Sequence, residues 1–334
     1  MASEHLPKPV LPPPPFSEPV PNPGEHGLRT SAIVFAYDEE AALRRCLPSL
    51  LESSVEEILV MYGGSDGSQH YLESLRDPRL HLELEPTRAG KWRAYNLAIE
   101  RVRGDLVFLI SGDISFPPTI FDHLRSRFSP DVGVVFPRVV PTNVRNTVSG
   151  LGAALWDVHD RQIVACEHAG LPIHGGELQA VRRILLEPLA GVINEDAYLC
   201  LRAAERGYRV LYDREAVVQN TVPETLNDLL RQRRRVNYGH RQLSAGGLDP
   251  STLDRLIWER PDLCLGVLGR AVAQRPTNAV RLPLLAALEL VALIRGNRDF
   301  VRGIDHGRWS LVRSGKDGRF PVPPGEPARR VPEH

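Results

Sequence analysis

The chain has 334 residues, of which 42% are hydrophobic and 25% charged. This length can bury one large core, or one domain with a substantial appendage. The formal net charge is zero, which argues against a general binder of nucleic acid or another polyanion. The cysteines are widely spaced without metal-ligand pairing, so we expect reduced thiols and a cytoplasmic location; they are Cys46, Cys166, Cys200 and Cys264.

Both ends of the chain are rich in proline, at residues 1–27 and again at 315–334. Such segments have little apolar surface to bury and favour extended polyproline conformations, so we expect loose tails. The first tail lacks the apolar core of a signal peptide. It is either a ligand for a proline-reading domain or a passive leader, and we favour the passive leader.

From Thr30 onward, strand and helix patterns alternate, which predicts an α/β layer fold with a mostly parallel sheet. The expected strands cover 31–36, 57–61, 80–84, 106–110 and 132–136, and the expected helices 39–51 and 92–102. In such sheets, ligands bind beyond the carboxyl ends of the strands. Tyr37, Tyr62–Gly64 and Ser111–Asp113 all follow strands, so we expect these three loops to meet at one edge.

Each of the following residues can be interpreted as a ligand contact or as ordinary local structure. Gly63 and Gly64 could let the backbone approach a nucleotide, or could form a tight turn. Lys91 begins a helix, which suits a bound phosphate but is also a common helix start. Asp113 could bind a divalent cation or be a turn residue. No GxGxxG follows the first strand, which argues against a dinucleotide-binding fold.

The second half of the sequence carries an acidic pair, Glu195–Asp196, at a predicted helix start. Asn194 is a candidate N-cap, and Gly207 supplies a left-handed residue after the helix. A carboxylate in the first turn is favoured by the helix dipole, so Asp196 is either part of a site or simply a good helix start.

Downstream, the patterns predict two short strands at 210–212 and 216–218, then a capping box at Thr221–Glu224 before another helix. On that helix Gln232 and Arg235 lie three residues apart and share a face. An arginine run is commonly solvated or binds nucleic acid, but the leucines just before this one favour a docked helix with some arginines in a cleft.

The order and spacing of these motifs resemble family 2 glycosyltransferases with the GT-A fold, over residues 29–245. The acidic pair followed by Gln-x-x-Arg is most similar to the chitin, hyaluronan and cellulose synthase branch. The motifs that carry the resemblance are Ala36–Glu40, Gly63–Ser68, Gly90–Lys91 with Asn96, Gly104–Asp105 before the strand ending at Asp113, Glu195–Asp196, Arg206–Val210 and Gln232–Arg235.

The resemblance implies inverting transfer of a sugar from a nucleotide donor, usually a UDP-sugar, to a hydroxyl acceptor that is a glycan, a lipid or a small molecule. Asp196, beside Glu195, would be the general base, and Gln232 and Arg235 would hold the acceptor and the diphosphate. Lys91 would approach the diphosphate, and Asp113 would bind Mn²⁺ or Mg²⁺. The residues expected to border the base and ribose are Ala36, Tyr37, Glu39, Tyr62, Gly63 and Gly64.

The sequence departs from the family pattern at three positions. Tyr62 stands where an aspartate commonly reads the uracil edge, which puts uridine specificity in question. Ser111 replaces the first aspartate of the Asp-x-Asp motif, so metal affinity should fall unless a histidine such as His174 or His240 helps. Val236 replaces the motif tryptophan, so acceptor choice should differ from that of the synthases.

The expected domains are a glycosyltransferase domain at 28–245 and a helical region at 246–314 that dimerises or shapes the acceptor cleft. Its most apolar segment, 282–294, is too short for the ~30 Å hydrocarbon core of a bilayer. This segment is either a buried helix or an interfacial helix, and we favour the buried helix. An interfacial helix would make the protein membrane-associated.

Two rival functions remain. One is a degenerate relative that binds a nucleotide or glycan without turnover. The other is a sugar-nucleotide nucleotidyltransferase, but that enzyme needs a glycine-rich basic loop where residues 37–41 stand.

Overall fold

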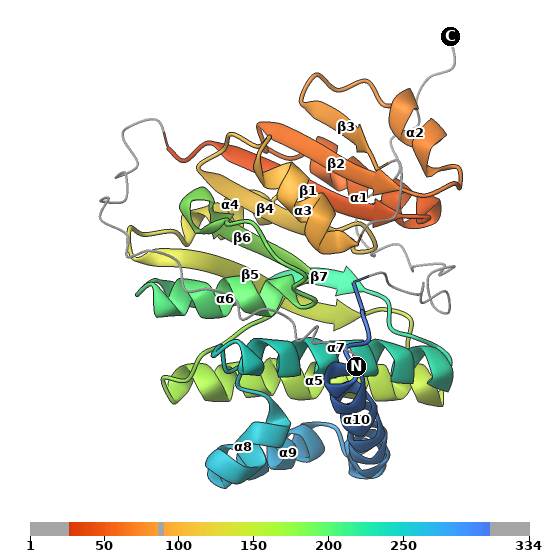
Figure 1. The fold of residues 1–334 in the computed structure, drawn as a ribbon, viewed down its shortest axis with the longest axis vertical. Coiled ribbons are helices and arrows are strands. Elements are labelled where there is room, and N and C mark those ends of the chain that lie inside the picture. The colour runs from red at the N-terminus through yellow and green to blue at the C-terminus, as the bar shows by residue number, and fades with distance from the viewer. Residues whose placement is uncertain (1–26, 86–89, 308–334) are drawn as a thin grey trace, which may run out of the picture.

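The computed structural model describes residues 27–85 and 90–307, which form a seven-stranded sheet with helices on both faces (Figure 1). The strand order is β3-β2-β1-β4-β6-β5-β7. Only β6 runs against its neighbours, antiparallel to both β4 and β5. The mostly parallel α/β sheet is therefore confirmed. The strands are β1 Thr30–Tyr37, β2 Glu57–Gly63, β3 Leu80–Leu84, β4 Leu106–Ser111, β5 Val132–Pro141, β6 Leu178–Arg182 and β7 Arg209–Asn220.

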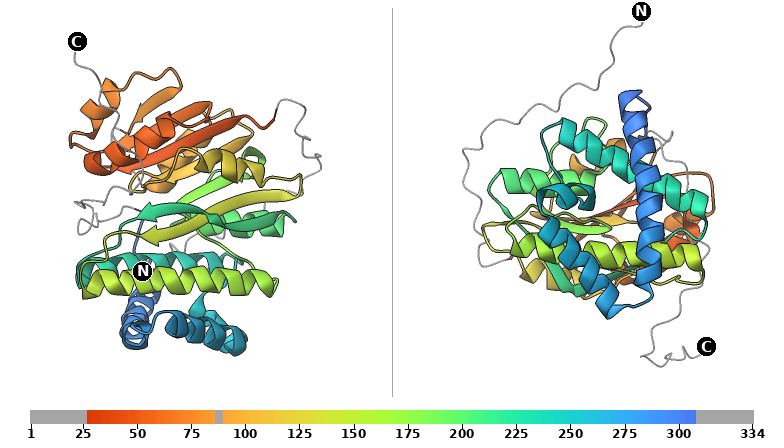
Figure 2. Two further views of the ribbon diagram at one scale, coloured as in Figure 1. Left: turned by 180° about the vertical axis from the view of Figure 1, so that it is seen from behind. Right: turned by 90° about the horizontal axis from the view of Figure 1, so that it is seen from below.

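Helices α1 Glu40–Leu51, α2 Ser68–Ser74 and α4 Ile120–Ser126 pack in one core cluster on one face of the sheet. Helices α3 Lys91–Ile99, α5 Thr147–His168 and α6 Glu195–Glu205 contribute to the cluster on the other face. Figure 2 shows the sheet from behind and from below. Because both faces are covered, the central strands are continuous apolar runs rather than alternating ones.

A helical layer extends the molecule beyond α5, as expected for the region after residue 245 (Figure 1). Helix α7, Leu226–Ala245, leads into α8 Leu253–Glu259, α9 Pro261–Gln274 and α10 Asn278–Val301. Helix α10 packs against α7 and α5, and α9 packs against α5. Within the described ranges, no helix combines the length and apolar character needed to cross a bilayer. The predicted tails, at 1–27 and 315–334, lie outside the described residues except for Gly27.

The expectation of a buried helix at 282–294 holds for one face of α10. Leu285, Leu288 and Ala292 are buried, whereas Leu290 and Ile294 are more than half exposed. The segment is apolar on nearly all sides in its sequence, but only one side is buried, because only that side packs against α7 and α5.

Two local predictions were wrong. The two short strands at 210–218 are one strand, β7, because the Asp213 carboxylate accepts the N–H groups of Glu215 and Ala216 and holds a bulge within it. The capping box at Thr221–Glu224 does not form. Helix α7 begins at Leu226 instead, and the Thr225 side chain caps it.

Candidate active site

A small polar cavity lies on the α3 and α6 face of the sheet, where the carboxyl ends of β1 and β4 meet the start of β6. Residues from several elements line it: Phe35, Lys91, Leu109, Ser111, Gly176, Glu177, Gln179, Glu195 and Asp196. Three of the residues predicted from the sequence thus converge here although they lie up to 105 positions apart, from Lys91 to Asp196. The arrangement agrees with the rule that ligands bind beyond strand ends.

The acidic pair is positioned by helix α7 as well as by its own helix. Helix α6 begins at Glu195, and Gly207 follows its end with φ of +80°, both as predicted. The predicted capping role of Asn194 is wrong, because its side chain makes no capping hydrogen bond. Its Nδ2 instead donates to the carbonyl oxygen of Val236 on α7 at 2.9 Å.

A second contact from α7 fixes the loop before α6. The Gln242 side chain donates to the carbonyl of Gly191 at 2.8 Å and accepts the N–H of Ile193 at 3.1 Å. Because α7 holds both Asn194 and this loop, the start of α6 cannot move independently of α7. The carboxylates of α6 and the arginines of α7 are therefore kept in a fixed relation.

Lys91, at the start of α3, forms an ion pair with Glu195, and its ammonium lies 5.3 Å from the centre of the Phe35 ring. Burial raises the pKa of Asp196 to about 6, and the negative charge of Glu195 adds to the rise. Lys91 and Arg235 act in the opposite direction. Asp196 is therefore ionised at neutral pH and is basic enough to take a proton.

The three arginines of the predicted run have different partners. Arg233 pairs with Glu289 and Arg234 with Asp299, both on α10. Arg235 is not among the residues that line the cavity, but its charge acts on those that do: burial lowers its pKa, and four carboxylates oppose that effect, those of Glu195, Asp196, Glu177 and Asp113. Arg233 and Arg234 thus hold α10 against α7, and the expectation that an arginine of this run enters a cleft stays a prediction for Arg235. Gln232, one turn earlier, is partly buried and is not among the residues lining the cavity.

Glu177 was missed at the level of sequence. It lies directly before β6 and opposite Ser111 of β4, whose N–H donates to the Glu177 carbonyl at 2.9 Å. Burial, and then the charge of Asp113, raises the pKa of Glu177 to about 7. No sequence pattern identified this residue, because its importance comes from the antiparallel pairing of β6 with β4.

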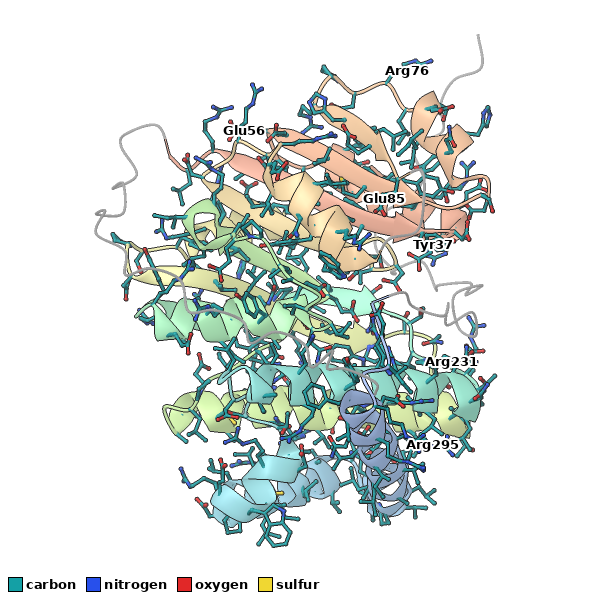
Figure 3. The ribbon with its side chains drawn as sticks, in the orientation of Figure 1. Tyr37, Glu56, Arg76, Glu85, Arg231 and Arg295 are labelled. Carbon is teal, nitrogen blue, oxygen red and sulfur yellow. The ribbon has the colours of Figure 1, made fainter. Side chains whose placement is uncertain are left out.

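The loops after β1 and β2 lie side by side, as expected. Tyr37 is in register with Gly63, and a Cβ on Gly63 would lie 3.3 Å from the Tyr37 ring. Gly64 has φ of +141°, a conformation that strongly favours glycine. The Asp38 carboxylate ties the two loops by accepting the N–H of Ser65 at 2.7 Å. Figure 3 shows Tyr37 on this edge, near Glu85 at the end of β3.

Two predicted nucleotide contacts point elsewhere. The Tyr62 side chain is 2% exposed and belongs to the core on the α1 face, where its hydroxyl donates to Asp66 at 2.9 Å. Ala36 belongs to the same core. The expectation that Tyr62 borders the base and ribose therefore does not hold for its ring, which is buried, although its hydroxyl lies beside Gly64 in the loop after β2. Glu39 occupies the N-cap position of α1.

Asp113 lies in the turn after β4, and its charge acts on Arg235, Arg45 and Glu177. The charges of Asp113 and Asp196 thus act on the same guanidinium group, that of Arg235. Carboxylate oxygens are the ligands that Mg²⁺ and Mn²⁺ prefer, so the position suits a cation bound to a diphosphate.

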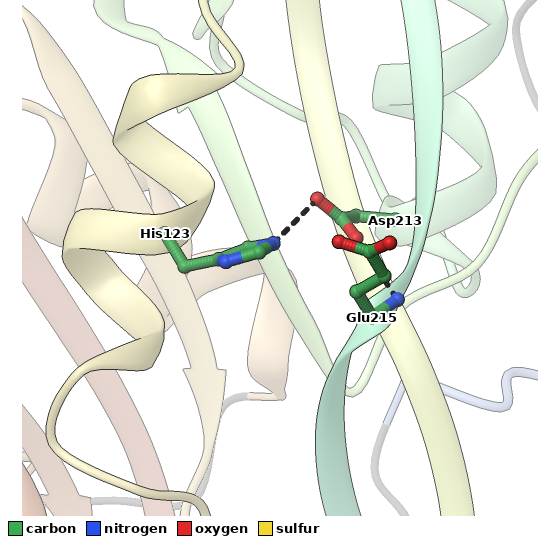
Figure 4. A group of neighbouring side chains, drawn as sticks. All are labelled: His123, Asp213 and Glu215. Carbon is green, nitrogen blue, oxygen red and sulfur yellow. Dashed lines mark hydrogen bonds and ion pairs between the residues drawn. The ribbon is translucent and has the colours of Figure 1, made fainter.

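Another acidic group could also hold an ion. Among the residues that the structure describes, one group of three metal-ligating side chains has its ligand atoms within 4.8 Å of one another: His123, Asp213 and Glu215 (Figure 4). Asp213 is already paired with Arg127 at 3.2 Å and with His123 at 3.0 Å, and it holds the β7 bulge. These contacts give the group a structural role.

The histidines considered as helpers of the metal site are elsewhere. His174 is buried and His240 is partly buried, with their ring centres 5.3 Å apart, and His159 adjoins His174 at 5.8 Å. Burial lowers the pKa of His174 to about 4, so it stays neutral. None of these rings lines the cavity. Among the described residues, none of them belongs to a group of metal-ligating side chains with Asp113.

Comparison with known proteins decides the family. The family model described as "Glycosyltransferase like family 2" matches residues 26–239. The chain belongs to glycosyltransferase family 2. An N-acetylglucosaminyltransferase of Rhizobium meliloti is 26% identical over 61% of this chain and 53% of its own length. One from Mesorhizobium japonicum is 24% identical over 66% of this chain and 56% of its own length.

The chain thus spans about half the length of these relatives. A mannosyltransferase from Pyrobaculum calidifontis, solved with GDP-Man and Mn²⁺, covers 85% of this chain and 90% of its own with a TM-score of 0.57 and 20% identity. This likeness confirms the GT-A fold. The assignment to the synthase branch stays a prediction.

Proposed function

We propose that this family 2 protein transfers a sugar from a UDP-sugar to a hydroxyl acceptor with inversion at the anomeric carbon. One observation carries the proposal: a carboxylate able to accept a proton, Asp196, lines one cavity with the cation of Lys91, and the positive charge of Arg235 acts on the same carboxylate. A reaction that deprotonates a hydroxyl and releases a diphosphate needs both kinds of group.

In the proposed reaction, Asp196 removes the proton of the acceptor hydroxyl as that oxygen attacks the anomeric carbon. The bond from this carbon to the diphosphate oxygen breaks, and the electron pair leaves with the diphosphate. Attack from the opposite face inverts the configuration. Arg235 and Lys91 stabilise the charge that develops on the diphosphate. Lys91 pairs with Glu195 in this structure, so the donor must compete with Glu195 for it.

A divalent cation fits the donor set of this site. Asp113, with the neighbouring charge of Glu177, would hold Mn²⁺ or Mg²⁺, which would neutralise charge on the diphosphate. The base and ribose would lie along Tyr37, Gly63 and Gly64. With Tyr62 turned away, uridine recognition would depend on the backbone at this edge.

The names of the relatives make UDP-GlcNAc the first donor to test. Donor hydrolysis and transfer would be measured for UDP-GlcNAc, other UDP-sugars and GDP-mannose, with Mn²⁺ and with a chelator. We expect turnover of a UDP-sugar that depends on the metal, and none by Asp196→Asn despite donor binding. Turnover of GDP-mannose alone would contradict the uridine assignment. Binding without turnover of any donor would favour the degenerate, nonenzymatic relative, which the departures from the family pattern at Tyr62, Ser111 and Val236 support.

A further inference from the structure

The loss of an aspartate at position 111 is matched by a carboxylate from another strand. β4 and β6 are antiparallel, with Leu109 opposite Gln179 and Ile110 opposite Leu178. The pairing continues to Ser111 and Glu177, joined by the hydrogen bond from the Ser111 N–H to the Glu177 carbonyl at 2.9 Å. Directly opposed residues place their side chains on the same face of a sheet, with Cβ atoms ~5 Å apart.

Side-chain contacts hold the Glu177 carboxylate in this corner. It interacts with the Ser111 hydroxyl, and the Asn220 amide donates to its Oε1 at 3.4 Å. Ser111 and Glu177 both line the cavity. The Glu177 carboxylate, directly before β6, therefore lies near the position that the carboxylate of an aspartate at position 111 would occupy.

The charge in this corner also fits a divalent cation. Asp113 lies in the turn two residues after Ser111, which is opposite Glu177, and its charge acts on Glu177. An ion between two such carboxylates would stabilise them. An Asp-x-Asp motif supplies two carboxylates from one strand. Here the same number comes from two strands.

We infer that Glu177 replaces the missing first aspartate of the motif and forms, with Asp113, the carboxylate pair of the divalent-cation site. The inference deepens the proposed function and rests on it for the presence of a donor diphosphate. It means that Ser111 does not mark a lost metal site.

The test moves the carboxylate from one strand to the other. Binding of Mn²⁺ is measured by the loss of its free electron paramagnetic resonance signal, with UDP present and no sugar. We expect Glu177→Gln to weaken Mn²⁺ binding at least about tenfold, the scale of loss when groups around a metal are removed. The double variant Ser111→Asp/Glu177→Gln should recover most of that affinity. Glu215→Gln, at the other acidic group, is the matched control and should have no effect.

Unchanged Mn²⁺ binding in Glu177→Gln would overturn the inference. So would a double variant Ser111→Asp/Glu177→Gln that still unfolds cooperatively but does not recover Mn²⁺ affinity. A third contradicting result is a loss of Mn²⁺ affinity in Glu215→Gln instead of Glu177→Gln. The measurement of Mn²⁺ binding does not depend on sugar transfer. If the natural sequence binds Mn²⁺ with this pattern but turns over no donor, the proposed function fails while the cation site stands.

An independent observation concerns the outward face of the C-terminal helices. Trp258 of α8 is 85% exposed and Leu265 of α9 is 71% exposed. On α10 the exposed apolar residues fall on the side away from the buried residues of this helix; they are Val280, Leu284, Leu290, Val291, Ile294 and Val301. An exposed apolar surface of this extent marks an interaction site.

The exposed charges in the C-terminal half of α10 are of one sign, whereas α8 and α9 also expose Glu259 and Asp262, which pair with Arg255 and Arg260. On α10 the acidic residues Glu289 and Asp299 are turned inward, where they pair with Arg233 and Arg234. The exposed charged residues at its C-terminal end are arginines, Arg295, Arg298 and Arg302, and Figure 3 shows Arg295 on α10. Exposed tryptophan and aliphatic side chains with flanking arginines are typical of helices that lie on anionic lipid.

We infer that the exposed face of α10, with Trp258 of α8, binds the surface of an anionic membrane. The full chain would be sedimented with phosphatidylcholine vesicles, with and without phosphatidylglycerol. We expect binding only with the anionic lipid, weakened by salt and lost in Leu290→Asp/Ile294→Asp. Val144→Asp, which changes an exposed residue before α5, is the control.

Equal binding to both vesicle types, or none to either, would refute the membrane surface. So would a dimer in light scattering that Leu290→Asp/Ile294→Asp dissociates without any effect of lipid, since the face would then cover a second copy of the chain.

Discussion

Replacing Asp196 by asparagine should abolish transfer and at the same time stabilise the protein at neutral pH. The pKa of this carboxyl rises from 3.8 to about 6 on folding, because burial and the charge of Glu195 disfavour its ionised form. A rise of about two units corresponds to about 3 kcal/mol at most, at 1.36 kcal/mol per unit. The side chain is only partly buried, so solvent reduces this value.

The sign follows from proton binding. Between about pH 4 and pH 6 the folded state binds more protons at Asp196 than the unfolded state does, so stability falls as the pH rises through this window. The loss of folding stability caused by the ionised Asp196 carboxylate is complete above about pH 6 and absent below about pH 4. The asparagine introduced by Asp196→Asn carries no charge and escapes this cost, and the remaining carboxylates, Glu195, Glu177 and Asp113, still balance Lys91 and Arg235.

Urea unfolding of both proteins across this pH range would measure the effect. We expect Asp196→Asn to raise the free energy of unfolding by ~1–3 kcal/mol above about pH 7, and to leave it nearly unchanged near pH 4. Glu100→Gln, which removes an exposed carboxylate at the end of α3, is the control and should show no such pH dependence. A variant that is less stable at neutral pH, or equally stabilised at every pH, would refute the electrostatic argument.

Three further outcomes are expected from the same site. Glu195→Gln should move the acidic limb of the transfer rate to lower pH, because the charge of Glu195 helps to raise the pKa of Asp196; an unmoved limb in a pH–rate profile would contradict this. Gly176→Ala should lower transfer by ~10²-fold, since its Cβ would lie 2.7 Å from Asp196 Oδ2 and displace that carboxylate. Gly266→Ala, whose nearest neighbour is 3.5 Å away, is the control for an added methyl group. Asp113→Ala should weaken donor binding chiefly when metal is present, and calorimetry that finds an equal loss with a chelator would exclude a metal-binding role.

The sequence determined the layered sheet and the helix boundaries around the acidic pair, because both are local consequences of composition. Apolar runs of five to seven residues form strands that are covered on both faces, and glycine at 207 permits the left-handed turn after α6. The order of short motifs also predicts the family, which the family model over residues 26–239 confirms.

Only the tertiary structure decided which side chains share the cavity. The direction of the Tyr62 ring depends on which face of β2 receives α1, and the partners of Arg233 and Arg234 lie more than 50 residues away on α10. Glu177 gains its position from an antiparallel pairing between strands that are distant in sequence. Local propensity sets the elements, but the side chains that meet depend on long-range register and packing, which one stretch of sequence does not encode.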